Sequence, residues 1–457
     1  MRKQFKKMFA LLLAGTLVLT SFTGCSKGVE KDKEMNAEVT ETTENGAEET
    51  TQAETKEEVS SLPETLDNPN ITILWHTSEE TYQTNKQNDP NAFDAVWSVL
   101  PEFEAKYGGK VEVKAVGWGE MKDTLINMVN AGEVCDLAQA NDQNFPIYPV
   151  KKLIQPISGY IDANDDFWYD GITNAFTFGG ESYAVGNDAT PIVLYYNKSL
   201  FESNGVKSPG EYYAEGNWNW DTFKEAAVSM TGDTDGDSVN DQFGFGWWDG
   251  DYGVFMTTNG VTNMAYNQDG TIGTNFGTEN AKEAVQFIQD AYVKDKYIDA
   301  SKSGDYFMNE FKSGKMAMTL EYGFNGFTAY ASDYEVDFVP LPVGPKGEKD
   351  KAAGGLTGWC VPVTASNGEA AAAFVRMSCE MYGEHINSIN VEKYGQEKVD
   401  LFNTLAQNVL FAPIGIEKYW DANWTIVSGI REGTPISTFL QVADEQIAEG
   451  AKITMEQ

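Results

Sequence analysis

The chain has 457 residues, and 33 Lys+Arg against 69 Asp+Glu give it a formal charge of −36 at pH 7. This length is enough for two or more domains, and the acidity excludes a nucleic-acid partner, because binding phosphates requires many Lys and Arg side chains. Arginine occurs only at Arg2, Arg376 and Arg431, which disfavours an anionic ligand, whereas 11 Trp, 21 Tyr and 25 Phe form an aromatic content that needs an explanation.

The first 24 residues have the pattern of a secretory signal peptide. Cations at positions 2, 3, 6 and 7 precede the apolar stretch Met8–Leu19, whose 12 residues are too few to span a bilayer. The next residues, Phe22-Thr23-Gly24-Cys25, resemble a bacterial lipobox, in which the Cys becomes the lipidated first residue. We therefore expect residues 1–24 to be removed and Cys25 to carry palmitate, holding the protein on the outer face of the cytoplasmic membrane.

Residues 25–66 predict a tether. Between Ser26 and Leu66 there are 12 Asp or Glu, four Lys and no aromatic residue. Such a composition cannot bury enough apolar surface to offset the entropy of ordering the chain. We predict a disordered acidic segment that links the lipid to the folded part.

The segment that follows predicts strands alternating with helices. We expect strands over 71–75, 111–116 and 136–140, and helices over 91–107 and 123–129, where apolar residues recur at helical spacing. Pro101 is expected to kink the first of these helices. Strands that alternate with helices pair in parallel, with the helices on the faces of the sheet.

Ligands of such sheets bind beyond the carboxyl ends of the strands. In this sequence those ends are Trp75-His76, Gly117-Trp118 and Asn141-Asp142. We interpret His76 as a loop residue with satisfied hydrogen bonds, and Trp118, Asn141 and Asp142 as candidates for ligand contact.

Four later stretches occur in an order that identifies a family. They are ESYAVGNDATPIVLYYNKSLFESNG (Glu181–Gly205), NWNWDTFKEAA (Asn217–Ala227), FKSGKMAMTLEYG (Phe311–Gly323), and FVPLPVGPKG followed by GGLTGWCVPVTASNGEAAAAF. The set resembles the family 1 extracellular solute-binding proteins of bacterial ABC importers, specifically sugar-binding lipoproteins. The resemblance extends from about Ile71 to the C-terminus.

The resemblance implies an α/β fold like that of periplasmic binding proteins, with two lobes joined by crossover strands and the ligand in the cleft between them. We assign residues 67–187 and 324–365 to the N-terminal lobe, and residues 188–323 and 366–457 to the C-terminal lobe. The implied ligand is an oligosaccharide or related sugar, delivered by a monomeric receptor to the transmembrane subunits of an ABC permease. ATP hydrolysis would belong to a separate subunit.

A sugar site needs flat aromatic side chains that cover the apolar face of a ring, and polar side chains that bond its hydroxyl groups. Successive strand residues face opposite ways, so only one of Trp247 and Trp248 is expected to face the ligand. Trp420 and Trp424 share one face of a late helix, and the resemblance does not choose between them. The predicted ligand-binding residues are Trp118, Asn141, Asp142, Asp188, Trp247, Trp248, Asp249, Tyr322, Trp359 and Trp424.

An acidic loop predicts a structural calcium site. Asp233, Asp235, Asp237 and Asp241 stand at positions 1, 3, 5 and 9 of an EF-hand-like loop, and Val239 would offer its carbonyl oxygen from position 7. The usual Gly at position 6 is Ser238, and position 12 is Gly244 instead of Glu. Many proteins of the resembled family carry a similar loop with Ca²⁺. The alternative is a solvated acidic turn.

No catalytic residue is predicted. The two histidines form no zinc-binding pattern, the G-x-S-x-G at Gly24–Gly28 straddles the expected cleavage site, and no P-loop is present. We therefore expect a binding protein and not an enzyme. Two alternatives stay open: a receptor for a cationic solute or peptide, which acidic side chains would suit, and a secreted glycosidase or lyase that uses paired carboxylates.

Overall fold

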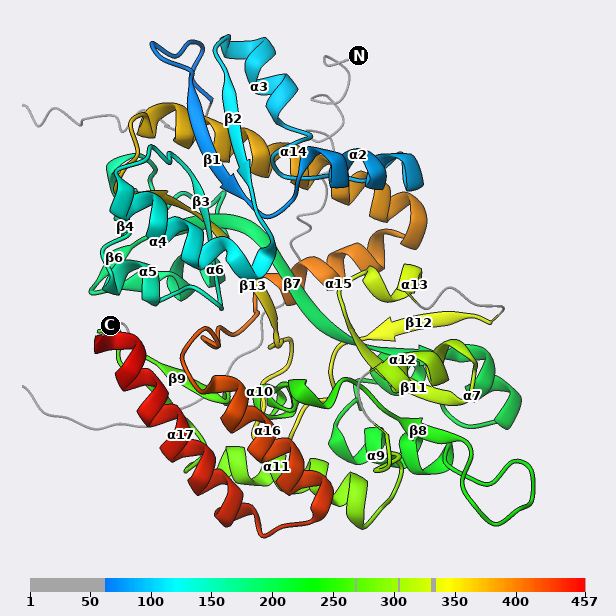
Figure 1. Ribbon diagram of the computed structural model, residues 1–457. Coiled ribbons are helices and arrows are strands. Elements are labelled where there is room, and N and C mark those ends of the chain that lie inside the picture. Colours follow the sequence, from blue (N-terminus) through cyan, green and yellow to red (C-terminus); the bar gives the residue numbers. More distant parts are fainter. Residues whose placement is uncertain (1–61, 268, 303–304, 330–333, 457) are drawn as a thin grey trace, which may run out of the picture. The chain divides into compact units, whose positions relative to one another are not determined.

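The computed structural model describes residues 62–267, 269–302, 305–329 and 334–456 (Figure 1). The predicted signal peptide, Cys25 and almost all of the predicted tether lie outside these residues. None of the described helices is both long enough and apolar enough to cross a membrane.

A parallel pair of strands begins the fold, as the sequence predicts. β1 (Ile71–Trp75) pairs in parallel with β2 (Val111–Ala115). α4 (Met121–Ala131) then leads toward β3 (Ala138–Asn141), and it ends at Gly132, which has the left-handed φ of 68° that favours glycine. The strands and helix predicted here are confirmed, with α4 longer than expected.

The helix predicted over residues 91–107 is wrong in its first half, because α3 covers only Leu100–Tyr107. Upstream, Asp94 Oδ1 accepts hydrogen bonds from the backbone N–H groups of Val96 and Trp97 at 2.9 Å each, and these local bonds compete with helical ones. Pro101 lies in the first turn of α3. A proline there loses no helical hydrogen bond, so it begins the helix and does not kink it.

The long strand β7 (Ala184–Asn197) crosses between the two lobes (Figure 1). Its first part, up to Pro191, pairs antiparallel with β13 (Gly354–Pro362), and its remainder pairs antiparallel with β11 (Met316–Tyr322). The sheet order is β3-β13-β7-β11-β8, with β8 at Phe243–Phe245. The predicted two-lobe α/β fold with crossover strands is confirmed.

One hydrophobic core packs β1 against α14 (Gly368–Tyr394). Ile73 and Trp75 of β1 belong to the same buried cluster as Phe374 of α14, whose ring centroid lies 5.3 Å from that of Phe103. We assigned all of residues 366–457 to the C-terminal lobe from the sequence. The first half of α14 packs instead against β1, which we assigned to the N-terminal lobe. The lobe boundaries stay a prediction.

A larger core explains much of the aromatic content. Phe223, on α9 (Trp220–Ser229), is fully buried, and its ring lies 5.0–6.1 Å from five others. Those neighbours are Trp218, Phe245, Phe255, Phe287 and Tyr297. Many of the aromatic residues therefore serve packing, and only the exposed ones are available to a ligand.

The remaining elements complete the two lobes. The remaining strands are β4 (Ile154–Gln155), β5 (Thr177–Phe178), β6 (Glu181–Ser182), β9 (Met264–Tyr266), β10 (Ile272–Thr274) and β12 (Val336–Val339). The helices not yet given are α2 (Glu79–Asn88), α5 (Ile147–Val150), α6 (Asp170–Ala175), α7 (Lys198–Asn204), α8 (Pro209–Ala214), α10 (Gly253–Thr258), α11 (Glu279–Val293), α12 (Asp305–Lys312), α13 (Asn325–Ala329), α15 (Gln396–Ala406), α16 (Tyr419–Glu432) and α17 (Ile436–Glu456). Short 3₁₀ turns occur at Trp118–Glu120, Ile157–Gly159 and Asp249–Asp251.

Candidate ligand-binding cleft

Three exposed tryptophans, Trp248, Trp420 and Trp424, form a cluster that we call the tryptophan triad. The ring of Trp248 lies 6.0 Å from that of Trp420 and 6.2 Å from that of Trp424. Each side chain is 42–45% exposed. Helix α16 places Trp420 and Trp424 one turn apart, and Trp248 directly precedes the 3₁₀ turn Asp249–Asp251. Exposed aromatic surface gathered in this way makes the triad a candidate binding site.

Pocket A, of about 440 Å³, lies where β3 ends and α16 begins. Its lining includes Trp118, Asn141, Gln143, Asn144 and Trp420. Backbone hydrogen bonds hold the two segments together, because the N–H groups of Ile414 and Gly415 donate to the Asp142 carbonyl oxygen at 2.8 and 3.2 Å. The pocket is therefore walled by two segments far apart in sequence.

Pocket B, of about 330 Å³, lies beside the end of β11. Its lining includes Ile192, Trp248, Asp251, Thr319, Glu321 and Tyr322. Tyr322 is 37% exposed, so it offers a second aromatic surface. Trp248 lines pocket B and Trp420 lines pocket A, and these two rings are neighbours in the triad. The two pockets therefore meet at the triad.

Carboxyl groups with raised pKa lie around this junction. Burial raises the pKa of Asp142 to about 6. Burial, with smaller contributions from the negative charges of Asp142 and Glu321, raises the pKa of Asp251 to about 7. Near neutral pH the Asp251 carboxyl group is therefore partly protonated, and it can donate a hydrogen bond as well as accept one.

Comparison of the sequence with known protein families agrees with this two-lobe fold. The profile of the bacterial extracellular solute-binding protein family matches residues 88–377, more than half of the chain. The chain belongs to this family.

Individual relatives are more distant. Binding proteins of Brucella abortus and Brucella suis are each 26% identical to this solute-binding protein over 265 residues, or 55% of its chain. The match spans 60% of the length of these curated relatives.

Solved structures of other binding proteins share the fold. A cyclo/maltodextrin-binding protein in complex with maltotetraose is 18% identical, with a TM-score of 0.63 over 85% of this chain and 97% of that one. The extracellular solute-binding protein of Staphylococcus aureus in complex with maltose is 15% identical, with a TM-score of 0.64 over 84% and 98%. A Listeria monocytogenes substrate-binding protein in complex with cycloalternan is 17% identical, with a TM-score of 0.59 over 85% and 99%.

In this solute-binding protein several predicted ligand-binding residues come together. Trp118 and Asn141 line pocket A, Trp248 and Tyr322 line pocket B, and Trp424 belongs to the triad. Asp142 directly follows Asn141, and its charge acts on Asp251 in pocket B. Their roles in binding stay a prediction.

Asp188 lies elsewhere. It is on β7, opposite Thr357, and burial raises the pKa of its carboxyl group to about 6. Its charge acts on Tyr169, Cys379 and Tyr382, none of which lines pocket A or pocket B. The structure therefore does not bring Asp188 to the triad.

Two tryptophans predicted to bind ligand are core residues. Trp359 is 6% exposed and stacks on Trp75 at 5.1 Å and 11° between planes. Trp247 is 2% exposed and stacks on Phe245 at 5.0 Å and 23°, although an edge of it reaches the wall of pocket B. Because other rings cover their faces, neither can stack on a sugar. Of the two, only Trp248 is exposed, and the expectation that it faces the ligand stays a prediction.

Asp249 is also placed differently from the prediction. It is 3% exposed, and its Oδ2 accepts a hydrogen bond from Arg431 Nη1 at 3.2 Å. Burial raises the pKa of Asp249, and the Arg431 charge acts against that rise. The carboxylate is thus an internal ion-pair partner and not an acceptor for ligand hydroxyl groups.

Sequence reasoning did not select Asp251 or Glu321. The strand β8 ends at Phe245 and the 3₁₀ turn begins at Asp249, so no periodic rule placed Asp251. Glu321 directly precedes Tyr322 at the end of β11. Its position beside a predicted ligand-binding residue could have identified it from the sequence. Trp420, left open against Trp424, lies in the triad with it.

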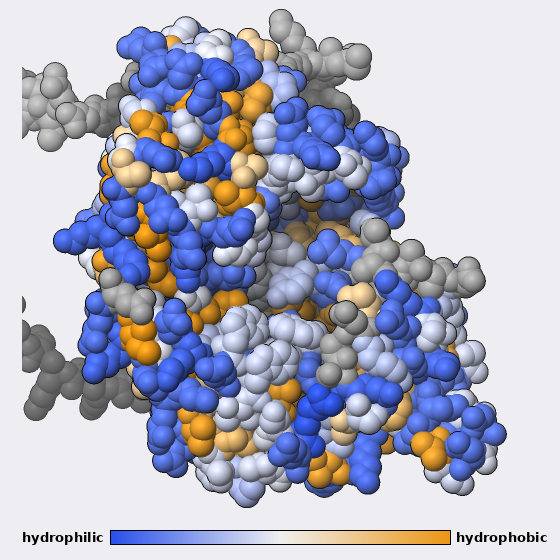
Figure 2. Space-filling view, viewed as in Figure 1, coloured by the Kyte–Doolittle hydropathy of each residue, from blue (hydrophilic) through white to orange (hydrophobic). Residues whose placement is uncertain are grey.

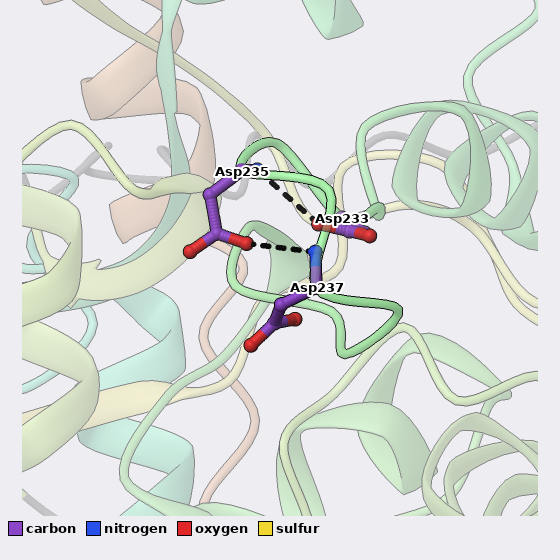
Figure 3. Close-up of side chains that lie close together, drawn as sticks. All are labelled: Asp233, Asp235 and Asp237. Atoms are coloured by element: carbon purple, nitrogen blue, oxygen red, sulfur yellow. Dashed lines mark hydrogen bonds between the residues drawn. The ribbon is translucent and has the colours of Figure 1, made fainter.

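The acidic loop gathers three of its four aspartates (Figure 3). Carboxylate oxygens of Asp233, Asp235 and Asp237 lie within 4.8 Å of one another. Ser238 has a left-handed φ of 71°, and its N–H donates to Asp233 Oδ2 at 2.7 Å, so it takes the backbone role of the usual glycine. Asp241 turns away to accept from the Thr234 N–H at 2.8 Å.

Proposed function

We propose that this protein is a lipid-anchored receptor that captures an oligosaccharide or related sugar and delivers it to an ABC permease. The observation that carries the proposal is the exposed tryptophan triad at the junction of two pockets. Flat aromatic rings cover the apolar faces of sugar rings, and the nearby polar side chains suit hydroxyl groups. Proteins of the same fold whose structures contain maltotetraose, maltose and cycloalternan support this class of ligand.

Capture would proceed by closure of the two lobes around the sugar. Pocket A is lined by residues beside β3 and by residues at the start of α16, which we assign to different lobes, so a ligand that fills it contacts both segments at once. Such a ligand stabilises the closed arrangement only by the extra contacts it makes there. The closed lobes would then present a combined surface to the permease, and hydrolysis of ATP would occur on a different subunit.

The ligand class is tested by calorimetry with maltose, maltotetraose, cycloalternan and an amine-bearing glucosamine oligomer. We expect saturable binding of at least one sugar, lost in Trp420→Ala. Tyr160→Ala is the matched control, because Tyr160 is an equally exposed aromatic residue (39%) that lines neither pocket. Absence of binding to every sugar would contradict the proposal.

A sugar that carries an amine is the second candidate. The negative charges of Asp142 and Glu321 both act on Asp251, which favours a cationic group beside Asp251. A cationic ligand was expected to gather Asp142, Asp188 and Asp249, but Asp188 lies on β7 opposite Thr357 and Asp249 pairs with Arg431. Tighter binding of the glucosamine oligomer than of its neutral analogue would decide for this candidate.

A separate assay with the same sugars tests the enzyme alternative. The family consists of binding proteins, and we infer that this member releases its sugar unchanged. Chromatography of each sugar after prolonged incubation with the protein should return only the starting compound. Shortened products that disappear on mutating a single carboxylate would show a glycosidase or lyase.

Anchoring through Cys25 is part of the proposal and rests on the lipobox-like sequence. Cells grown with labelled palmitate should yield a labelled protein in the membrane fraction. Cys25→Ser should abolish the label and release the protein, whereas Cys379→Ser, at a buried thiol, should leave both unchanged.

We also propose that the acidic loop binds Ca²⁺ as a structural ion, through Asp233, Asp235, Asp237 and the Val239 carbonyl oxygen. Three converging carboxylates fit a hard cation. Chelation should lower the Tm of the wild type but not that of Asp235→Ala. Asp269→Ala, in another exposed turn, is the control and should still respond to chelator. An unchanged Tm in the wild type would exclude the ion.

A further inference from the structure

Arg431 compensates a buried carboxylate behind the triad. It lies in the last turn of α16, where its Nη1 donates to Asp249 Oδ2 at 3.2 Å. Its Nη2 donates to the carbonyl oxygens of Ala300 and Lys302 at 2.8 Å each. The other oxygen of Asp249, Oδ1, is buried and has no hydrogen-bond partner among the described residues. A buried charge with a single partner depends strongly on that partner.

Asp249 belongs to the segment that presents Trp248. On one side of that segment, the Gly246 N–H donates to the Met318 carbonyl oxygen at 3.2 Å and fixes the end of β8 to the sheet. On the other side, the Asp249–Arg431 pair fixes the 3₁₀ turn. The indole of Trp248 folds over Gly250, where an added Cβ would come within 2.7 Å of the ring.

Helix α16 carries both Arg431, which pairs with Asp249, and two of the three tryptophans of the triad. Trp420 and Trp424 are on the first half of α16, and Arg431 is near its end. A movement of the turn relative to α16 would therefore separate Trp248 from both of its neighbours in the triad. Arg431 itself lines neither pocket A nor pocket B, so it can influence a ligand only through the residues that it holds.

We propose that Arg431 is a positioning residue, which fixes Trp248 against Trp420 and Trp424 and thereby sets the affinity of the cleft for its sugar. The consequence for affinity rests on the proposed function, whereas the positioning of Trp248 does not. Two measurements keep these parts separate.

The first measurement needs no ligand. Protein labelled with 5-fluorotryptophan is examined by fluorine NMR, and the Trp248 signal is identified by its loss in Trp248→Phe. Arg431→Met and Asp249→Asn should each shift or broaden this signal. Arg376→Met is the matched control, because Arg376 also makes a half-buried ion pair, to Asp165 at 2.9 Å, but on the other lobe. An unchanged Trp248 signal in both test variants would overturn the proposal.

Arg431→Lys guards against a variant that fails to fold. It keeps the positive charge but cannot bond Asp249 and the two carbonyl oxygens together, since an ammonium group lacks the planar fork of guanidinium. We expect a folded protein whose Trp248 signal moves in the same direction by a smaller amount. A signal identical to that of the wild type would count against positioning.

The second measurement uses maltotetraose, or the sugar of the calorimetric panel that binds the wild type most tightly. Arg431→Met should weaken its affinity at least tenfold, and Arg376→Met less than twofold. In a Trp248→Ala background the Arg431→Met change should cost less than twofold, because the residue that it positions is gone. Equal losses in both backgrounds would show that Arg431 acts on general stability. Failure of every sugar to bind would reject the proposed function and leave the NMR result to decide positioning.

Discussion

At the scale of single residues, two adjacent tryptophans have opposite environments. Trp247 is buried against Phe245, whereas Trp248 is 42% exposed in the triad. Both residues are tryptophans, so their different exposure comes from their surroundings: Trp247 packs against Phe245 and is thereby buried. Their substitutions should therefore affect different properties.

We predict that Trp247→Ala lowers the free energy of unfolding by about 3–5 kcal/mol, because it opens a cavity among packed rings. Trp248→Ala should change it by less than about 1 kcal/mol, as a partly exposed side chain loses few contacts, but should weaken sugar binding to a lower, still measurable affinity. Urea unfolding and calorimetry on both variants check this. A stable Trp247→Ala protein would contradict the assignment of Trp247 to the core.

A second prediction at this scale concerns Asp251. Its folded-state pKa of about 7 lies above its ordinary value of 3.8, so the folded protein holds the proton more tightly than the unfolded chain. The contribution of Asp251 to the free energy of unfolding therefore increases as pH falls from about 8 to about 4. A shift of about three units corresponds to at most about 4 kcal/mol over that range.

Asp251→Asn removes this contribution, so the variant should gain less stability than the wild type between pH 8 and pH 5. Urea unfolding at both pH values measures the difference. Asp269→Asn is the control, because hydrogen bonds from Thr271 lower the pKa of Asp269, so this carboxyl group stays ionised and adds no pH dependence between pH 8 and pH 5. Equal pH dependence in Asp251→Asn and the wild type would refute the raised pKa.

At the scale of elements, patterns with local causes were predictable. The strands near residues 71 and 111 follow from β-branched and alternating runs, and the crossover β7 follows from a family motif. The start of α3 was predicted wrongly because Asp94 accepts hydrogen bonds from the backbone N–H groups of Val96 and Trp97. The spacing of apolar residues does not reveal such bonds.

The candidate site was predictable only in part for a related reason. Trp118 and Trp248 follow strands, Tyr322 ends β11, and all three are exposed. Trp359 and Asp249 also looked available, but Trp75 covers the ring of Trp359 and Arg431 pairs with Asp249, both from distant parts of the sequence. Contacts between distant segments carry no signal in a single sequence.

One such contact joins α16 to the end of β3 and yields a prediction. A Cβ at Gly415 would come within 1.6 Å of the Gln143 carbonyl oxygen, so Gly415→Ala must push the two segments apart. We expect a loss of about 1–3 kcal/mol in the free energy of unfolding, the usual cost of overpacking, together with weaker sugar binding through pocket A. Gly277→Ala, at an open position, is the control. Unchanged affinity in Gly415→Ala would mean that this junction does not shape the site.

At the scale of the whole molecule, the formal charge of −36 is the dominant electrostatic feature. The face seen in Figure 2 is mostly hydrophilic, with hydrophobic residues in small separate patches. Ion pairs such as Lys110–Glu112 and Lys198–Glu335 are solvent-exposed, and pairs of this kind contribute little to stability. Repulsion among the excess carboxylates should therefore outweigh the attraction within these ion pairs.

The final prediction follows from that balance. A large net charge of one sign destabilises the compact state, and 0.15 M salt screens it over distances beyond about 8 Å. Raising NaCl from about 0.01 to 0.15 M should therefore increase the Tm, by roughly 2 °C or more if screening recovers about 1 kcal/mol. The scans are run with chelator present, so that metal binding cannot contribute, and are repeated with choline chloride to exclude specific binding of Na⁺. A Tm that falls with both salts would show that attractive ion pairs, and not the net charge, govern the electrostatics of this protein.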